Sequence, residues 1–303
     1  MTILVAGATG LAGSAIYREL LKGGEKVVGV SSKDVDLLDR KATFEYLKNL
    51  KPKVVIDAAA KVGGISANNN FPVEFLSENI QIQTNLMDAS HNSGVEKFVF
   101  LASSCVYPKS CPQPIKEEYI LTGPLEPTNS AYAMAKLSGI ELIKSYRRQF
   151  GHKWISVMPT NLYGPNDNFD LESSHVFPAL IRKFLDAKQS GAKSVTLWGS
   201  GKPRREFLHV DDLAKAILVC VKKYDSDQPI NIGSGLDLTI GELSKKIANS
   251  VGFDAEVIWD TNREDGTPQK VLDIKKISDL GWTPSISLDK GINLTVEWYL
   301  KNK

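Results

Sequence analysis

The chain has 303 residues, of which 42% are hydrophobic and 24% charged, and its formal net charge is +2. This length supports one large or two moderate domains, and so small a net charge gives no global reason to bind nucleic acid or an anionic membrane. Three cysteines without a Cys-x-x-Cys pair argue against a disulfide framework, and four scattered histidines predict no metal site.

The first half of the chain alternates short β-rich runs with helical patterns. The opening apolar run, Ile3 to Ala6, is too short for a signal peptide or a membrane span, so we expect a cytoplasmic protein. The alternation predicts a parallel sheet covered by helices. We expect strands over 2–6, 26–31, 53–57, 97–102 and 154–158, and helices over 11–22, 40–50, 73–92 and 130–149.

The pattern changes after Pro159. Turn-forming residues fill 164–168, and we then expect helices over 177–189 and 210–221 and a strand over 230–232. The predicted fold is α/β: a Rossmann-type, doubly wound parallel sheet with a smaller, discontinuous C-terminal substrate-binding domain. The sheet domain is expected over 1–163 plus about 207–234, and the smaller domain over about 164–206 plus 235–303. A ligand would lie between them, at the carboxyl ends of the strands.

A glycine-rich loop joins the first strand to the first helix. Its spacing is G-x-x-G-x-x-G, formed by Gly7, Ala8, Thr9, Gly10, Leu11, Ala12 and Gly13. Glycine avoids a side-chain clash in the turn, and the helix N-terminus directs N–H groups at a pyrophosphate. A tight turn without a ligand is the alternative, but the strand-loop-helix context favours a dinucleotide.

The end of the second strand bears on the choice of dinucleotide. Ser32 and Lys33 suit the 2′-phosphate of NADP, whereas an acid at this place typically binds the ribose hydroxyls of NAD. Lys33 could instead be a solvated loop lysine, with Asp34 taking the NAD role. Asp39 could meet the adenine or simply cap the next helix. After the third strand, small residues around Ala60 would let the cofactor lie against the backbone.

Ser103, Tyr132 and Lys136 form the candidate reaction site. Tyrosine and lysine four residues apart share one helix face, where the lysine charge is expected to lower the tyrosine pKa. A surface Tyr-Lys pair is the structural alternative. Together with the N-terminal glycines, the set resembles the extended branch of the short-chain dehydrogenase/reductases. Cys105 stands beside Ser103, although hydride transfer needs no thiol, so it suggests a second chemistry in the same pocket.

Longer motifs are similar to a narrower group, the GDP-L-fucose synthases, which are GDP-4-keto-6-deoxymannose 3,5-epimerase-reductases. The resemblance runs nearly end to end. It rests on the motifs at 59–65, 103–109, 125–129, 157–165, 174–176, 198–201, 205–212 and 265–268. One departure concerns Ala8 and Thr9, because family members can carry a basic residue there that grips the 2′-phosphate.

The resemblance implies a function for the thiol. A C4 ketone acidifies the hydrogens at C3 and C5, so each centre can be inverted through an enolate by an acid and a base on opposite faces. The resemblance assigns these roles to Cys105 and His175, since thiol and imidazole both exchange protons near neutral pH. NADPH then reduces C4, with Tyr132 protonating the oxygen, Lys136 orienting the nicotinamide ribose and Ser103 bonding the carbonyl.

Further contacts follow from the same resemblance. The GDP-sugar substrate, GDP-4-keto-6-deoxymannose, would be held by Lys183, Trp198, Arg205, Asp265 and Lys270. The cofactor would also meet Leu101, Ala102, Ser104, Pro159, Asn161 and Leu162. The resemblance further implies a homodimer that pairs the helices at 73–92 and 130–149.

Three alternatives remain open on the sequence. Cys105 could be a small buried hydrophobe and His175 a capping or loop residue. Another nucleotide-sugar enzyme of the extended branch, such as a 4-epimerase that recycles bound NAD, would need neither of them. A non-catalytic dinucleotide-sensing protein would be expected to have lost Tyr132 or Lys136, and both are present.

Overall fold

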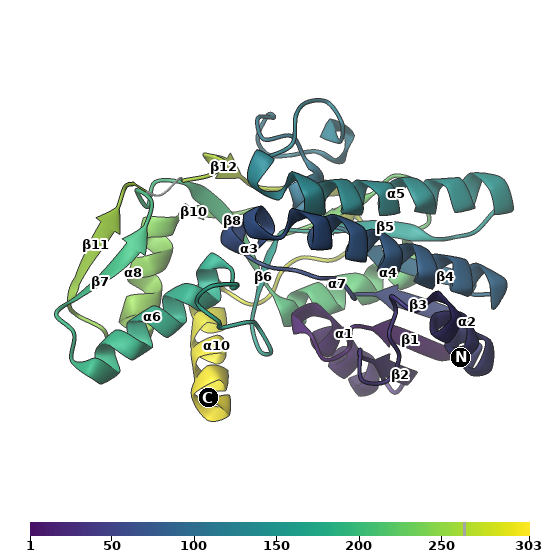
Figure 1. Cartoon of the computed structure of the whole chain (residues 1–303), viewed down its shortest axis with the longest axis horizontal. Coiled ribbons are helices and arrows are strands. Elements are labelled where there is room, and N and C mark those ends of the chain that lie inside the picture. The colour runs from purple at the N-terminus through teal and green to yellow at the C-terminus, as the bar shows by residue number, and fades with distance from the viewer. Residues whose placement is uncertain (263–264) are drawn as a thin grey trace.

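A six-stranded parallel sheet forms the centre of the protein. The computed structural model describes residues 1–262 and 265–303 (Figure 1). In spatial order the strands are β2 (Lys26–Val30), β1 (Thr2–Ala6), β3 (Val54–Asp57), β4 (Lys97–Leu101), β5 (Ile155–Pro159) and β9 (Ile230–Ile232). All neighbouring pairs are parallel, which confirms the predicted fold class.

Helices cover both faces of this sheet, because its strands are apolar on both sides. One face packs against α2 (Arg40–Leu50), α4 (Pro72–Asn92) and α5 (Ser130–Phe150), through residues such as Leu47, Leu86 and Ile140. The other face packs against α1 (Leu11–Lys22) and α7 (Val210–Lys223), through Ile16 and Ile217. Figure 1 shows α4 and α5 side by side, with α1 and α7 across the sheet.

A second group of elements surrounds a separate apolar core. Its strands are β6 (Asn161–Tyr163), β7 (Ser194–Trp198), β8 (Arg204–His209), β10 (Asp237–Thr239), β11 (Glu256–Asp260) and β12 (Gln269–Lys270). β8 pairs with β6, β10 and β12, whereas β7 pairs with β11. Its helices are α6 (Val176–Ser190), α8 (Ile240–Val251) and α10 (Leu288–Asn302). Phe184, Leu243 and Ile292 meet at the centre of this core.

Two features join this group to the central sheet. The carboxylate of Glu206 on β8 is buried and accepts the amides of Gly235 at 2.6 Å and Leu272 at 2.9 Å. Helix α9 (Lys275–Asp279) then returns the chain to the sheet, where Ile277 and Trp282 pack in the same core as α7. The strand ends and the smaller group of elements are therefore held against each other.

Most elements of the central sheet match the predicted ranges. α1 and α2 begin and end where expected, and the predicted strands agree within one residue. The short helix α3 (Ile65–Asn70) and the 3₁₀ turns at Ser104–Val106, Glu117–Tyr119 and Pro127–Asn129 were not predicted. Among the described residues, no helix is long and apolar enough to span a membrane.

Candidate active site

The glycine-rich loop lies between β1 and α1 at the carboxyl edge of the sheet. Gly7 has a φ of +75°, and a Cβ on Gly13 would lie 2.1 Å from the carbonyl oxygen of Gly7. The loop therefore packs closely on the helix, and a side chain at Gly13 would prevent this contact. Helix α1 begins after Gly10 without a side-chain cap and has no acidic residue in its first turn. Its N-terminus thus suits an anion such as a pyrophosphate.

The end of β2 places two of the predicted cofactor residues in solvent. Ser32 and Lys33 are exposed. The Asp34 carboxylate accepts hydrogen bonds from the amide and the hydroxyl of Ser31, both at 2.8 Å, and these bonds lower the pKa of Asp34. Asp34 is therefore engaged with its own loop. Asp39 caps α2 by accepting the amide of Ala42 at 3.0 Å, as its position before that helix allows.

The Lys136 side chain lies against the carboxyl end of β4. Its side chain is buried, its Nζ donates to the carbonyl oxygen of Leu101 at 2.9 Å, and it lies 4.7 Å from the centre of the Phe100 ring. Burial lowers the pKa of Lys136 to about 8. The ammonium is 5.9 Å from the centre of the Tyr132 ring, one helical turn away. Helix α5 thus places Tyr132 and Lys136 together at the carboxyl end of β4, which Ser103 follows in the chain.

Tyr132 keeps its proton in this structure. Burial raises the pKa of its phenol, the neighbouring Cys105 raises it further, and a hydrogen bond with Ser103 acts in the opposite direction. The expectation that the pKa of Tyr132 falls towards neutrality is therefore wrong here, because burial is the largest influence on the phenol and raises its pKa. A phenol that stays protonated is suited to donate a proton to a substrate oxygen.

Cys105 is held by two polar neighbours at the start of the 3₁₀ turn after β4. The Ser103 hydroxyl accepts the Cys105 amide at 3.2 Å, and the Asn129 side-chain amide donates to the Cys105 Sγ at 3.4 Å. Asn129 Oδ1 is buried without a hydrogen-bond partner among the described residues. The thiol is partly exposed. A partly exposed cysteine whose thiol accepts a side-chain hydrogen bond differs from a cysteine that only fills a core.

His175 stands at the N-terminus of α6 and does not cap it with its side chain. The preceding residues are tied to the loop after β3, because the Gly64 amide donates to the Ser173 carbonyl at 2.9 Å. His175 is exposed to solvent as a whole residue, yet protein atoms surround its imidazole closely enough to lower its pKa. At neutral pH the imidazole is therefore in the form that accepts a proton.

The predicted substrate residues gather on the smaller group of elements. Lys183 Nζ lies 5.2 Å from the ring centre of Trp198, which is exposed. The Asp265 carboxylate accepts the amide and hydroxyl of Ser200 at 2.7 and 2.6 Å. The Arg205 guanidinium is close enough to Cys105, Glu126 and Asp265 for these groups to raise its pKa, against the larger effect of burial, which lowers it. Lys270 follows on β12, which pairs with β8 beside Arg205.

The remaining cofactor residues lie at the carboxyl ends of the central strands. Leu101, Ala102 and Ser104 are buried at the end of β4. Pro159 ends β5, and the Asn161 side chain beyond it donates to the Glu206 carbonyl at 2.8 Å. Ala60 and Leu162 are half-buried.

Comparison with known proteins identifies the family. The NAD dependent epimerase/dehydratase family matches residues 3–233. The chain belongs to this family. It is 50% identical to GDP-L-fucose synthase 1 of Arabidopsis thaliana, over 99% of this chain and 93% of that protein. The predicted resemblance to the GDP-L-fucose synthases is therefore confirmed.

Solved structures of the family share the whole fold. A GDP-L-fucose synthetase of Naegleria fowleri, solved bound to NADP, is 33% identical with a TM-score of 0.91, over 99% of this chain and 94% of that one. A GDP-6-OMe-4-keto-L-xylo-heptose reductase of C. jejuni is 34% identical with a TM-score of 0.94, over 100% of this chain and 98% of that one. Proteins named for different GDP-sugars thus share this architecture.

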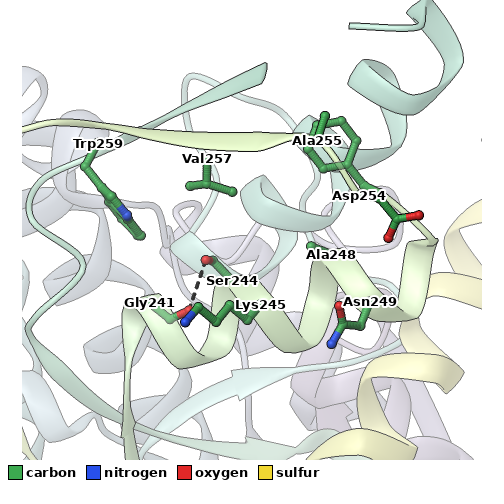
Figure 2. Close-up of a pocket in the computed structure, with 10 residues that line it drawn as sticks. Gly241, Ser244, Lys245, Ala248, Asn249, Asp254, Ala255, Val257 and Trp259 are labelled. Atoms are coloured by element: carbon green, nitrogen blue, oxygen red, sulfur yellow. Dashed lines mark hydrogen bonds between the residues drawn. The ribbon is translucent and has the colours of Figure 1, made fainter. Parts of the chain in front are cut away.

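Asn129 and its bond to the thiol were not predicted from the sequence. Asn129 lies inside one of the motifs that carry the resemblance, but spacing alone did not connect it to Cys105, 24 residues earlier. The structure also shows a groove of about 480 Å³ between α8 and β11 (Figure 2), lined by residues such as Ser244, Lys245 and Trp259. None of the predicted site residues lines it, so we assign it no part in the site.

Proposed function

We propose that this chain is a bifunctional GDP-L-fucose synthase. It would invert C3 and C5 of GDP-4-dehydro-6-deoxy-D-mannose (GDP-4-keto-6-deoxymannose) and reduce C4 with NADPH to give GDP-L-fucose. The observation that supports this most directly is the thiol of Cys105, held by Asn129 beside Ser103 and Tyr132. A reductase alone needs the phenol, whereas a thiol at the same carbonyl supplies a group for the neighbouring carbons.

In the reduction, Tyr132 and Ser103 act on the ketone oxygen, and Lys136 supports them. NADPH, when bound, supplies the hydride for C4. Tyr132, which keeps its proton through burial, donates that proton to the developing alkoxide. The Ser103 hydroxyl bonds the same oxygen. Lys136 contributes its positive charge and orients the nicotinamide ribose, and the helix holds it against the Leu101 carbonyl.

In the epimerisation, Cys105 and His175 act at the carbons beside the ketone. One group removes a proton from C3 or C5, and the other returns a proton to the opposite face, so the proton count of the sugar is unchanged. The His175 imidazole, with its pKa lowered by burial, is ready to accept a proton at neutral pH. Ser103 and Tyr132 would stabilise the enolate oxygen between the two transfers.

The binding residues follow the same proposal. The loop from Gly7 to Gly13 would receive the cofactor pyrophosphate, with Ser32 and Lys33 at the 2′-phosphate and Ala60, Leu101, Ala102, Ser104, Pro159, Asn161 and Leu162 along the remainder. Lys183, Trp198, Arg205, Asp265 and Lys270 would hold the GDP-sugar. The basic groups among them suit a diphosphate.

Three further proposals concern the whole molecule. The cofactor domain would comprise 1–163 plus about 207–234, and the substrate domain about 164–206 plus 235–303. The protein would be cytoplasmic and homodimeric. Exposed apolar side chains at Val73 and Leu76 on α4 and Met134 on α5 support a contact between copies through these helices.

The test is a reaction with GDP-4-keto-6-deoxymannose in deuterated water. With NADPH, we expect NADPH oxidation and solvent deuterium at both C3 and C5 of the product. Without NADPH, both positions of the recovered ketone should still exchange. Oxidation of NADPH with no deuterium at either carbon would leave a reductase and contradict the epimerase. Exchange without NADPH oxidation would contradict the reductase.

Lys33→Ala is expected to weaken NADPH binding by about tenfold, because one charge-assisted contact with the 2′-phosphate is lost. NADH binding should be unchanged, since NADH lacks that phosphate. Dissociation constants from the change in nicotinamide fluorescence would measure both. Lys26→Ala, at the exposed opposite end of β2, is the matched control. An equal loss for both cofactors in Lys33→Ala would contradict the assignment.

A further inference from the structure

Asp57 is a carboxyl group with 0% exposure at the carboxyl end of β3, and none of the steps above uses it. Its Oδ1 accepts the Ala59 amide at 3.1 Å, whereas Oδ2 is buried without a hydrogen-bond partner among the described residues. Burying an unpaired carboxylate costs free energy, and an apolar or amide side chain would occupy the same place at lower cost. Packing therefore does not explain why an acid stands here.

Asp57 shares one face of the sheet with Lys136. It pairs in register with Phe100 of β4, and paired residues of neighbouring strands point to the same side. Val55, two residues earlier on the same side of β3, packs with Phe100 in the core against α4 and α5. The Lys136 ammonium lies over the Phe100 ring at 4.7 Å and is itself buried. A buried acid and a buried base are thus neighbours of the same phenyl ring.

The two groups influence each other in a definite direction. Burial raises the pKa of Asp57 to about 6, so Asp57 is ionised at pH 7 and above. Burial lowers the pKa of Lys136 to about 8, and the charge of Asp57 opposes this decrease. The same negative charge raises the pKa of Tyr132. An ionised Asp57 therefore favours the proton-bearing form of both groups.

We propose that Asp57 is a positioning residue that provides the negative counter-charge for the Lys136 ammonium beside Phe100. The proposal rests on the proposed function, in which charged Lys136 assists the reduction while Tyr132 donates a proton. Without Asp57, the pKa of the buried ammonium would fall further, and the site would lose this positive charge at a lower pH.

The other groups around Asp57 do not replace this charge. Helix α5 contributes Lys136 and Tyr132, and the loop after β3 contributes the uncharged Ala59 amide. β1 places Ala6 at the matching register. On α4, the Glu78 carboxylate is paired with Lys61 at 2.8 Å. Among the described residues, Asp57 is the acid that acts on Lys136.

The test replaces Asp57 by asparagine and follows Lys136 directly. Lysines carry ¹³C at Cε, and the Lys136 resonance is assigned by its absence from the Lys136→Met protein. In protein without cofactor or substrate, we expect the titration midpoint of Lys136 to fall by about one pH unit in Asp57→Asn. Asp88→Asn, which removes a carboxylate from the far end of α4, should leave it unchanged. The alkaline limb of kcat/KM for NADPH oxidation should move to lower pH with Lys136.

A second measurement follows the Lys136 resonance in the wild-type protein. The wild-type Lys136 resonance should also shift near pH 6, where Asp57 takes up its proton. The proposal is overturned if this step is absent, or if Asp57→Asn melts like the wild type and its Lys136 titrates unchanged. These spectra contain no substrate or cofactor, so they stand independently of the deuterium experiment. Failure of the proposed function would appear in the deuterium experiment and would not change the Lys136 titration.

Discussion

Replacing Tyr132 with phenylalanine is expected to lower kcat for NADPH oxidation by about a thousandfold, since a positioned general acid typically contributes two to four orders of magnitude. The phenol is the group in the site that burial keeps protonated, and its Ser103 hydrogen bond directs it towards the same oxygen. Phenylalanine keeps the ring and its edge contact with Phe75, so the loss should be chemical and not structural. Stopped-flow absorbance of NADPH at saturating substrate measures the effect.

The same variant separates the two proposed reactions. Cys105 and His175 transfer the protons at C3 and C5, and in Tyr132→Phe the Ser103 hydroxyl still bonds the enolate oxygen, so exchange in deuterated water should fall far less than ketone reduction. Tyr299→Phe on α10, which removes a hydroxyl in the smaller group of elements, should change neither reaction. If Tyr132→Phe reduced the ketone at the normal rate, the role of proton donor would pass to another group.

The central sheet was predictable because local rules agree with the tertiary structure. Its strands are continuous apolar runs, and α1 follows a glycine-rich loop that fixes its first residue. β10 has three residues and β12 has two, so neither is long enough to show a periodicity. These strands exist because β8 offers them partners, and Glu206 anchors the adjoining loops.

Sequence spacing predicts which side chains share a helix face, but it does not predict their electrostatics. The spacing of Tyr132 and Lys136 places both on one face of α5, and the structure keeps that arrangement. The direction of the Tyr132 pKa depends on burial by neighbouring elements, which spacing does not contain. Asn129 and Asp57 reach the site through folding alone, from the 3₁₀ turn at Pro127–Asn129 and from β3. Such residues position other side chains and do not act on the substrate themselves, so no catalytic motif of their own identifies them.

Replacing Cys105 with serine is expected to lower deuterium exchange at C3 and C5 by at least about a hundredfold, because an aliphatic hydroxyl is a far weaker acid than a thiol and is a poor proton donor or acceptor near neutral pH. Serine is close in size and can still accept the Asn129 amide, so the local structure should persist. Tyr132, Lys136 and Ser103 remain, and the unepimerised ketone should still be reduced. Mass spectrometry and NMR of the product would show a GDP-sugar without deuterium at C3 and C5.

The cysteine at position 111 provides the matched control. Cys111 is also partly exposed, lies six residues further along the chain and has no part in the proposed chemistry. Cys111→Ser should exchange and reduce like the wild type. GDP-L-fucose formed by Cys105→Ser at the normal rate would show that the thiol only fills space, and the chain would then need another acid or base beside His175. If Cys105→Ser instead loses exchange but retains reduction, then exchange at C3 and C5 needs the thiol whereas reduction at C4 does not. That result is what a thiol placed beside a phenol predicts.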